Sequence, residues 1–293
     1  MHSVFSGPLQ VERLAIAIEA LPPHLRGMRV VQLSDLHYDG LRLSDRLLDR
    51  AISVCNEQEP DLVVLTGDYV TTDPEPAWEL VRHLKRLESR AGVYAVLGNH
   101  DLYRRRSKAV VTKALESIGI HVLWNQVAYP FGDSVALVGL PDLWARDFKP
   151  ASLFASIPSE IPRLVLCHNP DGAEVLQQWR ADLILAGHTH GGQIVVPGIG
   201  PLALALEPMR KIVPKPLRRF VPYLSECKKV VEHWEHALGL HRVGENLLYV
   251  NRGLGTYFPG RLFCWPELTV FTLEPKLERS LEVKDRDVVL FSQ

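Results

Sequence analysis

The sequence predicts an α/β fold, and three observations lead to this prediction. Short apolar segments recur along the chain, and segments with helical spacing of apolar residues alternate with them. Most apolar segments stop at a glycine or at a polar residue, as strands do at a sheet edge. The 293 residues are 46% hydrophobic and 23% charged, which is typical of an ordinary globular chain. We therefore expect one domain over residues 1–293 with a large buried core.

The expected elements of the first half follow from this alternation. Residues 9–21 alternate apolar with smaller or polar side chains before Pro22 and Pro23. Residues 44–57 place apolar side chains at helical spacing after a serine cap, and Pro60 then ends the pattern. The expected strands are 9–21, 28–34, 62–65 and 93–97, and the expected helices are 44–57, 76–90 and 104–117.

The second half continues the rhythm and then changes in composition. The expected strands are 135–140, 163–167, 183–186, 247–250 and 268–273, with a helix over 171–180. From Pro201 onward, basic and apolar residues mix with few acids. This mixture is typical of a lid, a partner-binding helix or a membrane-surface contact, with an amphipathic helix over the sheet as the alternative. We expect a basic and apolar insertion or lid at about 201–242.

Composition narrows the classes of function and the compartment. The net charge of −1 and the pI of about 6.9 indicate no general attraction to nucleic acid, and no nucleic-acid partner is expected. The four scattered cysteines lack the CxxC spacing of a thiolate zinc site, so we expect reduced and mostly buried thiols. Residues 1–7 do not resemble a signal peptide, and no apolar run is long enough to span a membrane. We expect a cytoplasmic protein, with peripheral membrane association through 201–230 as an extension of this prediction.

Polar side chains with metal-binding chemistry follow the expected strands. They are Asp35, His37, Asp68, Asn99, His168, His188 and His190. The carboxyl ends of strands in an open α/β sheet form its ligand crevice, so these side chains can meet there. Seven donors are too many for one ion but suit two ions about 3.5 to 4 Å apart. The mixture of imidazoles and carboxylates favours manganese, iron, zinc or a similar ion over calcium or magnesium.

The order Asp-x-His, Gly-Asp, Gly-Asn-His-Asp, His and Gly-His-x-His resembles the calcineurin-like metallophosphoesterases, over roughly residues 29–273. The resemblance implies a β-sandwich flanked by helices, in αββα layers, with the metal site at the carboxyl ends of strands. It implies two divalent ions, most readily Mn²⁺, and attack by a metal-bridging hydroxide on a phosphodiester or pyrophosphate bond. Asp35, His37 and His190 would hold one ion and Asn99, His168 and His188 the other, with Asp68 bridging. His100 would protonate the leaving oxygen or stabilise the developing charge, and Asp101 would orient His100.

Departures from sister groups narrow the resemblance. Thr71 stands where purple acid phosphatases have a tyrosine, and Asp101 where protein serine/threonine phosphatases have a glutamate. The segments 188–193 and 251–256 resemble the small bacterial phosphodiesterase branch, some of whose members cleave UDP-2,3-diacylglucosamine. A lipid-linked pyrophosphate is therefore one alternative substrate, and a non-catalytic scaffold is the alternative from another class. For substrate contacts the candidates are Arg104, for which a solvated helical face is the alternative, and Arg252. The histidines at 233, 236 and 241 are not expected to form a further metal site.

Overall fold

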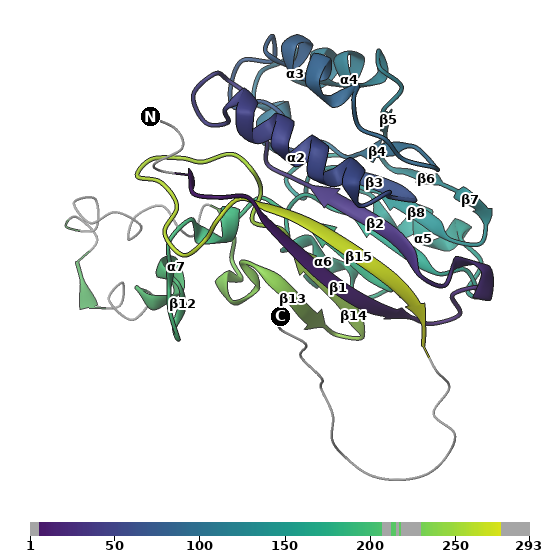
Figure 1. The fold of residues 1–293 in the computed structure, drawn as a ribbon. Coiled ribbons are helices and arrows are strands. Elements are labelled where there is room, and N and C mark those ends of the chain that lie inside the picture. Colours follow the sequence, from purple (N-terminus) through teal and green to yellow (C-terminus); the bar gives the residue numbers. More distant parts are fainter. Residues whose placement is uncertain (1–5, 207–211, 215–216, 218–229, 277–293) are drawn as a thin grey trace.

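The computed structural model describes residues 6–206, 212–214, 217 and 230–276, and its core is two six-stranded sheets packed face to face (Figure 1). The first sheet has, in spatial order, β1 (Gln10–Ile18), β15 (Glu267–Pro275), β2 (Met28–Leu33), β3 (Leu62–Leu65), β4 (Val93–Ala95) and β5 (His121–Val122). The second has β13 (Gly239–Val243), β14 (Asn246–Val250), β10 (Leu183–Ala186), β9 (Arg163–Leu166), β8 (Ala136–Gly139) and β6 (Gln126–Ala128). Strand β7 (Pro130–Asp133) and the β11–β12 hairpin (Val195–Val196 and Gly200–Pro201) lie outside these two sheets.

The central strands of each sheet run in one direction. Strands β2 to β5 are parallel neighbours in the first sheet, and β8, β9, β10 and β14 are parallel neighbours in the second. Antiparallel pairing occurs toward the margins, where β15 pairs with β2, β13 with β14 and β6 with β8. Residues that follow the parallel strands of one sheet therefore share its carboxyl edge.

The strands read as unbroken apolar runs because both of their faces are buried. In β3, Leu62 and Val64 face the layer between the two sheets, whereas Val63 and Leu65 face the helices. In β10, Leu183 and Leu185 face the same inter-sheet layer. Alternate residues of a strand point to opposite faces, so a strand covered on both sides is apolar at most positions, with the buried Gln32 of β2 as an exception.

Helices cover the outer face of each sheet. Helices α2 (Asp45–Glu57), α3 (Ala77–Leu84) and α4 (Ser107–Glu116) pack on the first sheet, and α5 (Pro150–Ser156) and α6 (Gly172–Leu176) pack on the second (Figure 1). Leu48 and Leu80 belong to the first helix–sheet core, and Phe154 and Leu176 to the second. The predicted sandwich flanked by helices, in αββα layers, is confirmed.

Three predicted helices are too long. The helix expected over 76–90 ends at Leu84, and Leu87 packs against the same core from the turn that follows. The helix expected over 104–117 begins at Ser107, so the three arginines before it lie outside the helix. The helix expected over 171–180 spans Gly172–Leu176. The spacing of apolar residues alone could not show where each helix ends, because the residues beside the helix continue the same spacing.

The segment from 201 to 242 is described in part. It contains α7 (Leu202–Ala205) and a 3-10 helix at Trp234–His236, and its end enters β13, which pairs with β14. Most of the expected membrane-contact stretch, 201–230, lies outside the described residues, so its role stays a prediction. Among the described residues, no helix is long and apolar enough to cross a membrane. Cys55, Cys167 and Cys264 are buried free thiols, as expected, and Cys227 lies outside the described residues.

Candidate metal centre

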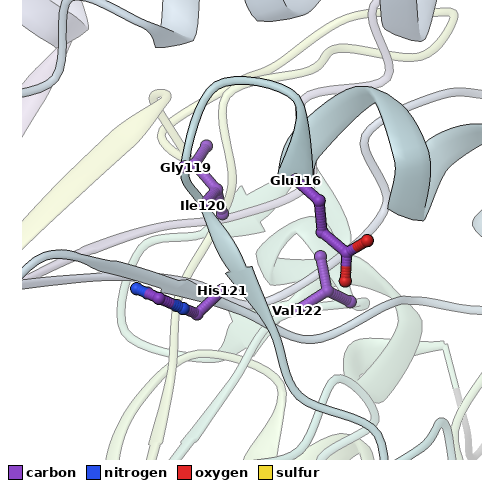
Figure 2. Close-up of a pocket in the computed structure, with 5 residues that line it drawn as sticks. All are labelled: Glu116, Gly119, Ile120, His121 and Val122. Atoms are coloured by element: carbon purple, nitrogen blue, oxygen red, sulfur yellow. The ribbon is translucent and has the colours of Figure 1, made fainter.

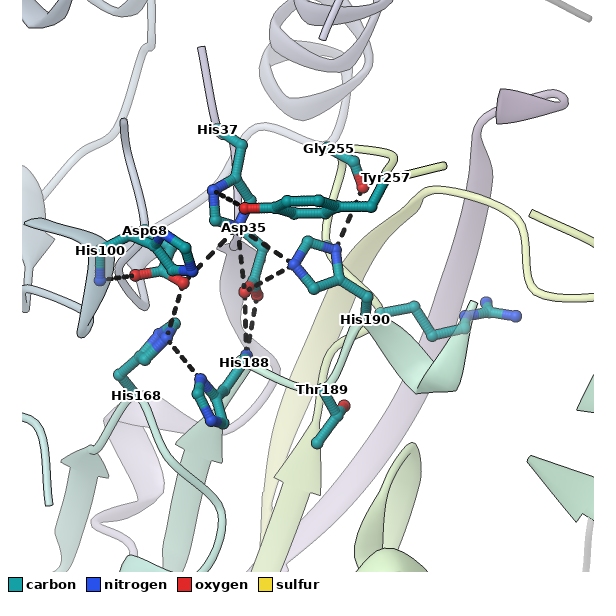
Figure 3. A network of polar contacts seen from close by, with 12 residues as sticks. Asp35, His37, Asp68, His100, His168, His188, Thr189, His190, Gly255 and Tyr257 are labelled. Carbon is teal, nitrogen blue, oxygen red and sulfur yellow. Dashed lines mark hydrogen bonds and ion pairs between the residues drawn. The ribbon is translucent and has the colours of Figure 1, made fainter. Parts of the chain in front are cut away.

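Six of the seven polar residues predicted as metal ligands lie close together (Figure 3). Asp35 and His37 follow β2, Asp68 follows β3 and Asn99 follows β4; His168 follows β9, and His188 and His190 follow β10. One trio consists of Asp35, His37 and His190, and a second consists of Asp68, His168 and His188. Within each trio the candidate ligand atoms lie within 4.8 Å of one another. The structure therefore brings together residues that are more than 150 positions apart in the sequence.

Asp68 lies between the two trios. Its Oδ2 is 3.1 Å from Nε2 of His168 and 3.5 Å from Nε2 of His37. The Nε2 atoms of His37 and His190 are 3.0 Å apart, and Nε2 of His168 is 3.2 Å from Nδ1 of His188. Nitrogen atoms bound to one ion at about 2.0 to 2.1 Å approach each other to a similar distance. The donor atoms are therefore spaced as cation ligands would be.

The second ring nitrogen of each of these histidines meets an oxygen. A carbonyl oxygen can only accept, so a ring nitrogen bonded to it carries the proton, and in a neutral ring the other nitrogen keeps its lone pair. Such partners fix the tautomer and orientation of metal-binding histidines. The pairs are His37 Nδ1 with the Tyr257 hydroxyl (3.1 Å), His168 Nδ1 with the Thr66 carbonyl (2.6 Å), His188 Nε2 with the Val230 carbonyl (2.8 Å) and His190 Nδ1 with the Gly255 carbonyl (3.1 Å).

The backbone at the site is strained. Left-handed φ values are uncommon for residues other than glycine, and each costs of order 1 to 3 kcal/mol unless the surroundings impose it. Five of the predicted ligands have them: Asp35 (51°), His37 (44°), Asp68 (57°), His188 (73°) and His190 (52°). Strain of this kind clusters at functional sites, where it aims side chains at a common point.

At two positions in the motifs, only glycine fits, because a predicted ligand lies too close for a Cβ atom. A Cβ atom at Gly187 would lie 2.1 Å from the Ser34 Oγ and 2.3 Å from the Asp35 Oδ2. A Cβ atom at Gly98 would lie 2.2 Å from the Asp68 Oδ1. Since real Cβ contacts are never this short, either substitution would displace a predicted ligand.

Asn99 supplies an independent sign that the residues fit a cation. Its Oδ1 is buried and has no hydrogen-bond partner in the described part of the chain. A buried carbonyl oxygen without a partner is costly, because it has lost its water and gained nothing in exchange. A divalent ion within reach of this oxygen would satisfy it, and an amide oxygen is a suitable ligand for such an ion.

The charges at the site are set by burial and by the carboxylates. Burial lowers the pKa of both His37 and His190 to about 3, so both rings are neutral near pH 7. Burial opposes charge on His168, but the adjacent Asp68 carboxylate outweighs it and raises the pKa of His168 to about 10. Burial likewise opposes charge on Asp68, yet the neighbouring His168 holds the pKa of that carboxyl well below its usual value. Without a metal, a cationic His168 therefore pairs with Asp68.

The structure separates the two predicted catalytic residues. The ring of His100 lies at the edge of the centre, 4.9 Å from the ring of His37, and its backbone N–H donates to the Asp68 Oδ1 at 2.9 Å. Nδ1 of His100 donates to the carbonyl of Thr71 at 2.6 Å, which leaves Nε2 unoccupied among the described contacts.

Asp101 does not contact the ring of His100 in the described hydrogen bonds, contrary to the expectation that it orients this ring. Its buried carboxylate accepts from the backbone N–H groups of Gly98, Asp68, Tyr69 and Val70, at 2.8 to 3.2 Å. Thr71 orients the imidazole instead, and Asp101 braces the loop that carries Asp68. The reason is geometric, since adjacent side chains on the 3-10 turn His100–Leu102 point in different directions.

The substrate-binding candidates lie in different surroundings. The side chain of Arg252 is bonded to Glu12 and Glu267, so its charge is used in a structural ion pair. Arg104 is exposed and precedes α4. The rings of His233 and His236 stack 5.9 Å apart, but they belong to neither trio.

Two residues of the site were missed in the sequence. Tyr257 contacts His37, and the buried Arg261 donates to the backbone carbonyls of Gly253, Gly255 and His190. Tyr257 directly follows the segment 251–256, which carries part of the family resemblance. Its position in the sequence could therefore have indicated that it lies at the site. A single arginine in a Pro-Gly-Arg turn gives no such signal.

A separate pocket lies at the corner of α4 and β5, lined by Glu116, Gly119, Ile120, His121 and Val122 (Figure 2). Strand β5 runs parallel to β4, so a pocket at its start lies at the opposite end of the sheet from the metal centre. The ring of His121 stacks on Tyr94 at 4.8 Å. This pocket does not belong to the candidate metal centre.

The clustered imidazoles and carboxylates, beside two helix-flanked sheets, suit a metal-dependent phosphoesterase. Residues 28–192 match the family model described as calcineurin-like phosphoesterase. The chain belongs to this family and is a metallophosphoesterase, a hydrolase of phosphoric esters.

Curated relatives match most of the chain. Phosphodiesterase YaeI of Escherichia coli (strain K12) is 37% identical over 250 residues, which cover 84% of this chain and 82% of the relative. The UDP-2,3-diacylglucosamine pyrophosphatase LpxG of Chlamydia trachomatis is 29% identical, with 88% of this chain and 87% of the relative covered. The metallophosphoesterase YkuE of Bacillus subtilis (strain 168) is 31% identical, with 87% and 82% covered. These proteins are similar along nearly their whole length, not only at the motifs.

Proposed function

We propose that the protein hydrolyses a phosphodiester or pyrophosphate bond with a binuclear metal centre. The observation that carries the proposal is the position of the Asp68 Oδ2, within 3.5 Å of a histidine from each trio. Asp68 would be shared, with Asp35, His37 and His190 on one ion and Asn99, His168 and His188 on the other. The mixed nitrogen and oxygen shell favours Mn²⁺, with iron and zinc as alternatives.

The residues around the centre support this chemistry. Divalent ions held there would polarise a phosphoryl oxygen and bring the pKa of a bound water to about 7. His100 has one ring nitrogen committed to the Thr71 carbonyl, so its Nε2 is the atom that can donate a proton to the leaving oxygen. Asp101 fixes the loop on which Asp68 stands, through bonds to four backbone N–H groups.

A lipid-linked pyrophosphate at a membrane surface is the second candidate substrate. The similarity to the UDP-2,3-diacylglucosamine pyrophosphatase LpxG favours it. Between residues 210 and 229 the sequence holds seven lysines and arginines among apolar residues, which suits contact with an anionic surface. A cytoplasmic location and a peripheral membrane contact through 201–230 are part of this candidate function. The non-catalytic scaffold is disfavoured, because every residue of the ligand motifs is present.

Substitutions at the shared ligand test the proposal. Asp68→Asn and His188→Ala should each lower turnover of bis-p-nitrophenyl phosphate by at least about a hundredfold and reduce the bound metal, since each removes a ligand. His100→Ala should retain its metal but lose about a hundredfold to ten-thousandfold in turnover, because only proton transfer is removed. His24→Ala is the matched control, because His24 is an exposed histidine whose ring contacts Ser134.

Turnover and metal content by mass spectrometry together decide the outcome. Unchanged turnover in both Asp68→Asn and His188→Ala would show that the proposed centre does not perform the reaction. A panel of a phosphomonoester, a generic diester, a cyclic nucleotide and a UDP-linked acylated sugar would identify the substrate class. Preference for the acylated sugar would establish the second candidate.

A further inference from the structure

An unusually apolar loop projects beside the metal centre. We call residues 257–263 the apolar loop; in it Phe258 is 94% exposed, Phe263 is 56% exposed and Leu262 is 50% exposed. Leu262 pairs with Ile194, and the neighbouring β11–β12 hairpin carries Ile199, which is 62% exposed. Figure 1 shows this loop extending from the sandwich on the same side as α7 and β12. Grouped apolar side chains in water mark an interaction surface more often than single ones do.

The apolar loop is held rigidly in this exposed position. Arg261, which is 5% exposed, donates to the carbonyls of Gly253 (3.1 Å), Gly255 (2.6 Å) and Cys264 (3.1 Å). The backbone N–H of Leu262 donates to the carbonyl of Gln193 at 2.9 Å. Phe263 has a φ of 51°, a conformation that a bulky residue adopts only when its surroundings impose it. The backbone hydrogen bonds of the loop therefore hold the aromatic rings in their exposed positions.

The apolar loop begins beside the metal centre. Tyr257, its first residue, contacts Nδ1 of His37 at 3.1 Å and precedes Phe258 in the chain. The ring of His100 lies 6.3 Å from the ring of Tyr257 and 6.4 Å from the ring of Tyr103, which is 71% exposed. His100 thus stands between the apolar loop and the segment that begins at Tyr103.

Cations follow Tyr103 in the chain. Arg104, Arg105 and Arg106 directly follow Tyr103, and all three are exposed. None of them forms an ion pair with a residue in the described ranges. The two segments whose tyrosine rings lie near His100 therefore carry exposed apolar side chains in one case and exposed positive charge in the other.

We propose that the apolar loop and the arginines at 105 and 106 dock the protein onto an anionic lipid bilayer, with the metal centre facing the membrane. Aromatic rings that project from one loop can enter the boundary between the head groups and the acyl chains of a bilayer. A stable contact with a protein partner would instead need a broad complementary surface. Arginines beside them match the anionic head groups. This docking deepens the proposed function, because it would present a phosphoester carried by a lipid to the metals, yet it can be measured without turnover.

Vesicle flotation tests the docking directly. The full chain is mixed with vesicles of phosphatidylcholine alone, or of equal parts phosphatidylcholine and phosphatidylglycerol, and the bound fraction is measured. The double variant Phe258→Ser, Phe263→Ser should bind anionic vesicles at least about tenfold more weakly, since two apolar side chains are lost from the interface. Arg105→Gln with Arg106→Gln should lose about thirtyfold on anionic vesicles and little on neutral ones. Tyr129→Ser, a half-exposed aromatic position between β6 and β7, is the matched control and should bind as the unaltered protein does.

Turnover of bis-p-nitrophenyl phosphate separates this proposal from the proposed function. The double phenylalanine variant should keep the turnover of the unaltered protein, because neither ring belongs to the metal centre. Failure of the unaltered protein to float with anionic vesicles, or equal flotation of the phenylalanine variant, would overturn the docking proposal and leave the hydrolase standing. Light scattering that shows a dimer abolished by the same variant would instead assign the apolar loop to contact between two copies of this chain.

Discussion

At the scale of single residues, the metal-facing histidines are fixed by the bonds of their second ring nitrogens. Three of these bonds go to backbone carbonyls, at Thr66, Val230 and Gly255. The fourth goes to a side chain, the hydroxyl of Tyr257 on His37. Burial raises the pKa of Tyr257, so this group remains a hydroxyl in neutral solution. Tyr257 is therefore the one partner in this set that substitution can remove without altering the backbone.

Replacing Tyr257 with phenylalanine should weaken metal binding. The ring of His37 would lose the hydroxyl that holds its orientation, and such losses cost about tenfold to a hundredfold in metal affinity. Calorimetric titration of the metal-free protein with Mn²⁺ measures the effect. Tyr94→Phe is the control, since Tyr94 stacks on His121 at the other end of the sheet. Equal affinity in Tyr257→Phe and the unaltered protein would show that the Tyr257 hydroxyl does not position His37.

Sequence patterns predicted residues that the structure brings together, but not the groups that support them. Asp35, Asp68 and the histidines could be predicted because each stands after an apolar strand, and strand direction then brings them to one edge. The partner of His100 could not be predicted, because the atom that orients it is a backbone carbonyl, which every residue has. Arg261 was missed for a related reason, since its hydrogen bonds also go to backbone carbonyls.

At the scale of elements, a clear apolar pattern decided which strands the sequence predicted, since β4 was predicted with three residues and β13 was missed with five. Strands β2, β3, β9 and β10 have at least four residues buried on both faces, and their apolar runs were clear. Strand β5 has two residues and β6 has three, which is too short to show alternation. Helix α2 was predicted accurately because its sequence has an N-terminal capping residue as well as apolar residues at helical spacing. Its cap, Ser44, accepts a hydrogen bond from the backbone N–H of Leu47 at 3.3 Å.

Removing this cap should destabilise the protein without changing its chemistry. Ser44→Ala removes the side-chain acceptor of the Leu47 N–H, which then keeps only its bond to the Ser44 carbonyl, and the loss of such a cap costs about 1 kcal/mol. Urea unfolding followed by circular dichroism measures this loss. Ser53→Ala is the matched control, because Ser53 lies on the exposed face of the same helix and bonds to Glu57. A Ser44→Ala variant as stable as Ser53→Ala would show that the cap contributes little.

At the scale of the whole molecule, each trio of ligands takes members from both sheets. Asp35 and His37 follow β2 of the first sheet, whereas His190 follows β10 of the second. Asp68 follows β3 of the first sheet, and its partners His168 and His188 follow strands of the second. An ion bound by either trio would therefore join the two sheets at their carboxyl edge. This arrangement would couple metal binding to the stability of the sandwich.

Removing the metal should lower the thermal stability of the whole domain. A ligand that binds the folded state alone stabilises it by about 2.7 kcal/mol at a hundred times its dissociation constant. For a chain of this size each kcal/mol shifts Tm by roughly 2 to 4 °C, so chelation should lower Tm by several degrees. Scanning calorimetry with Mn²⁺ and with EDTA measures the difference, and Asp68→Asn should respond much less because its centre is incomplete. If chelation leaves Tm unchanged in a protein shown to bind metal, the ions do not hold the sheets together and the coupling inferred from the mixed trios is wrong.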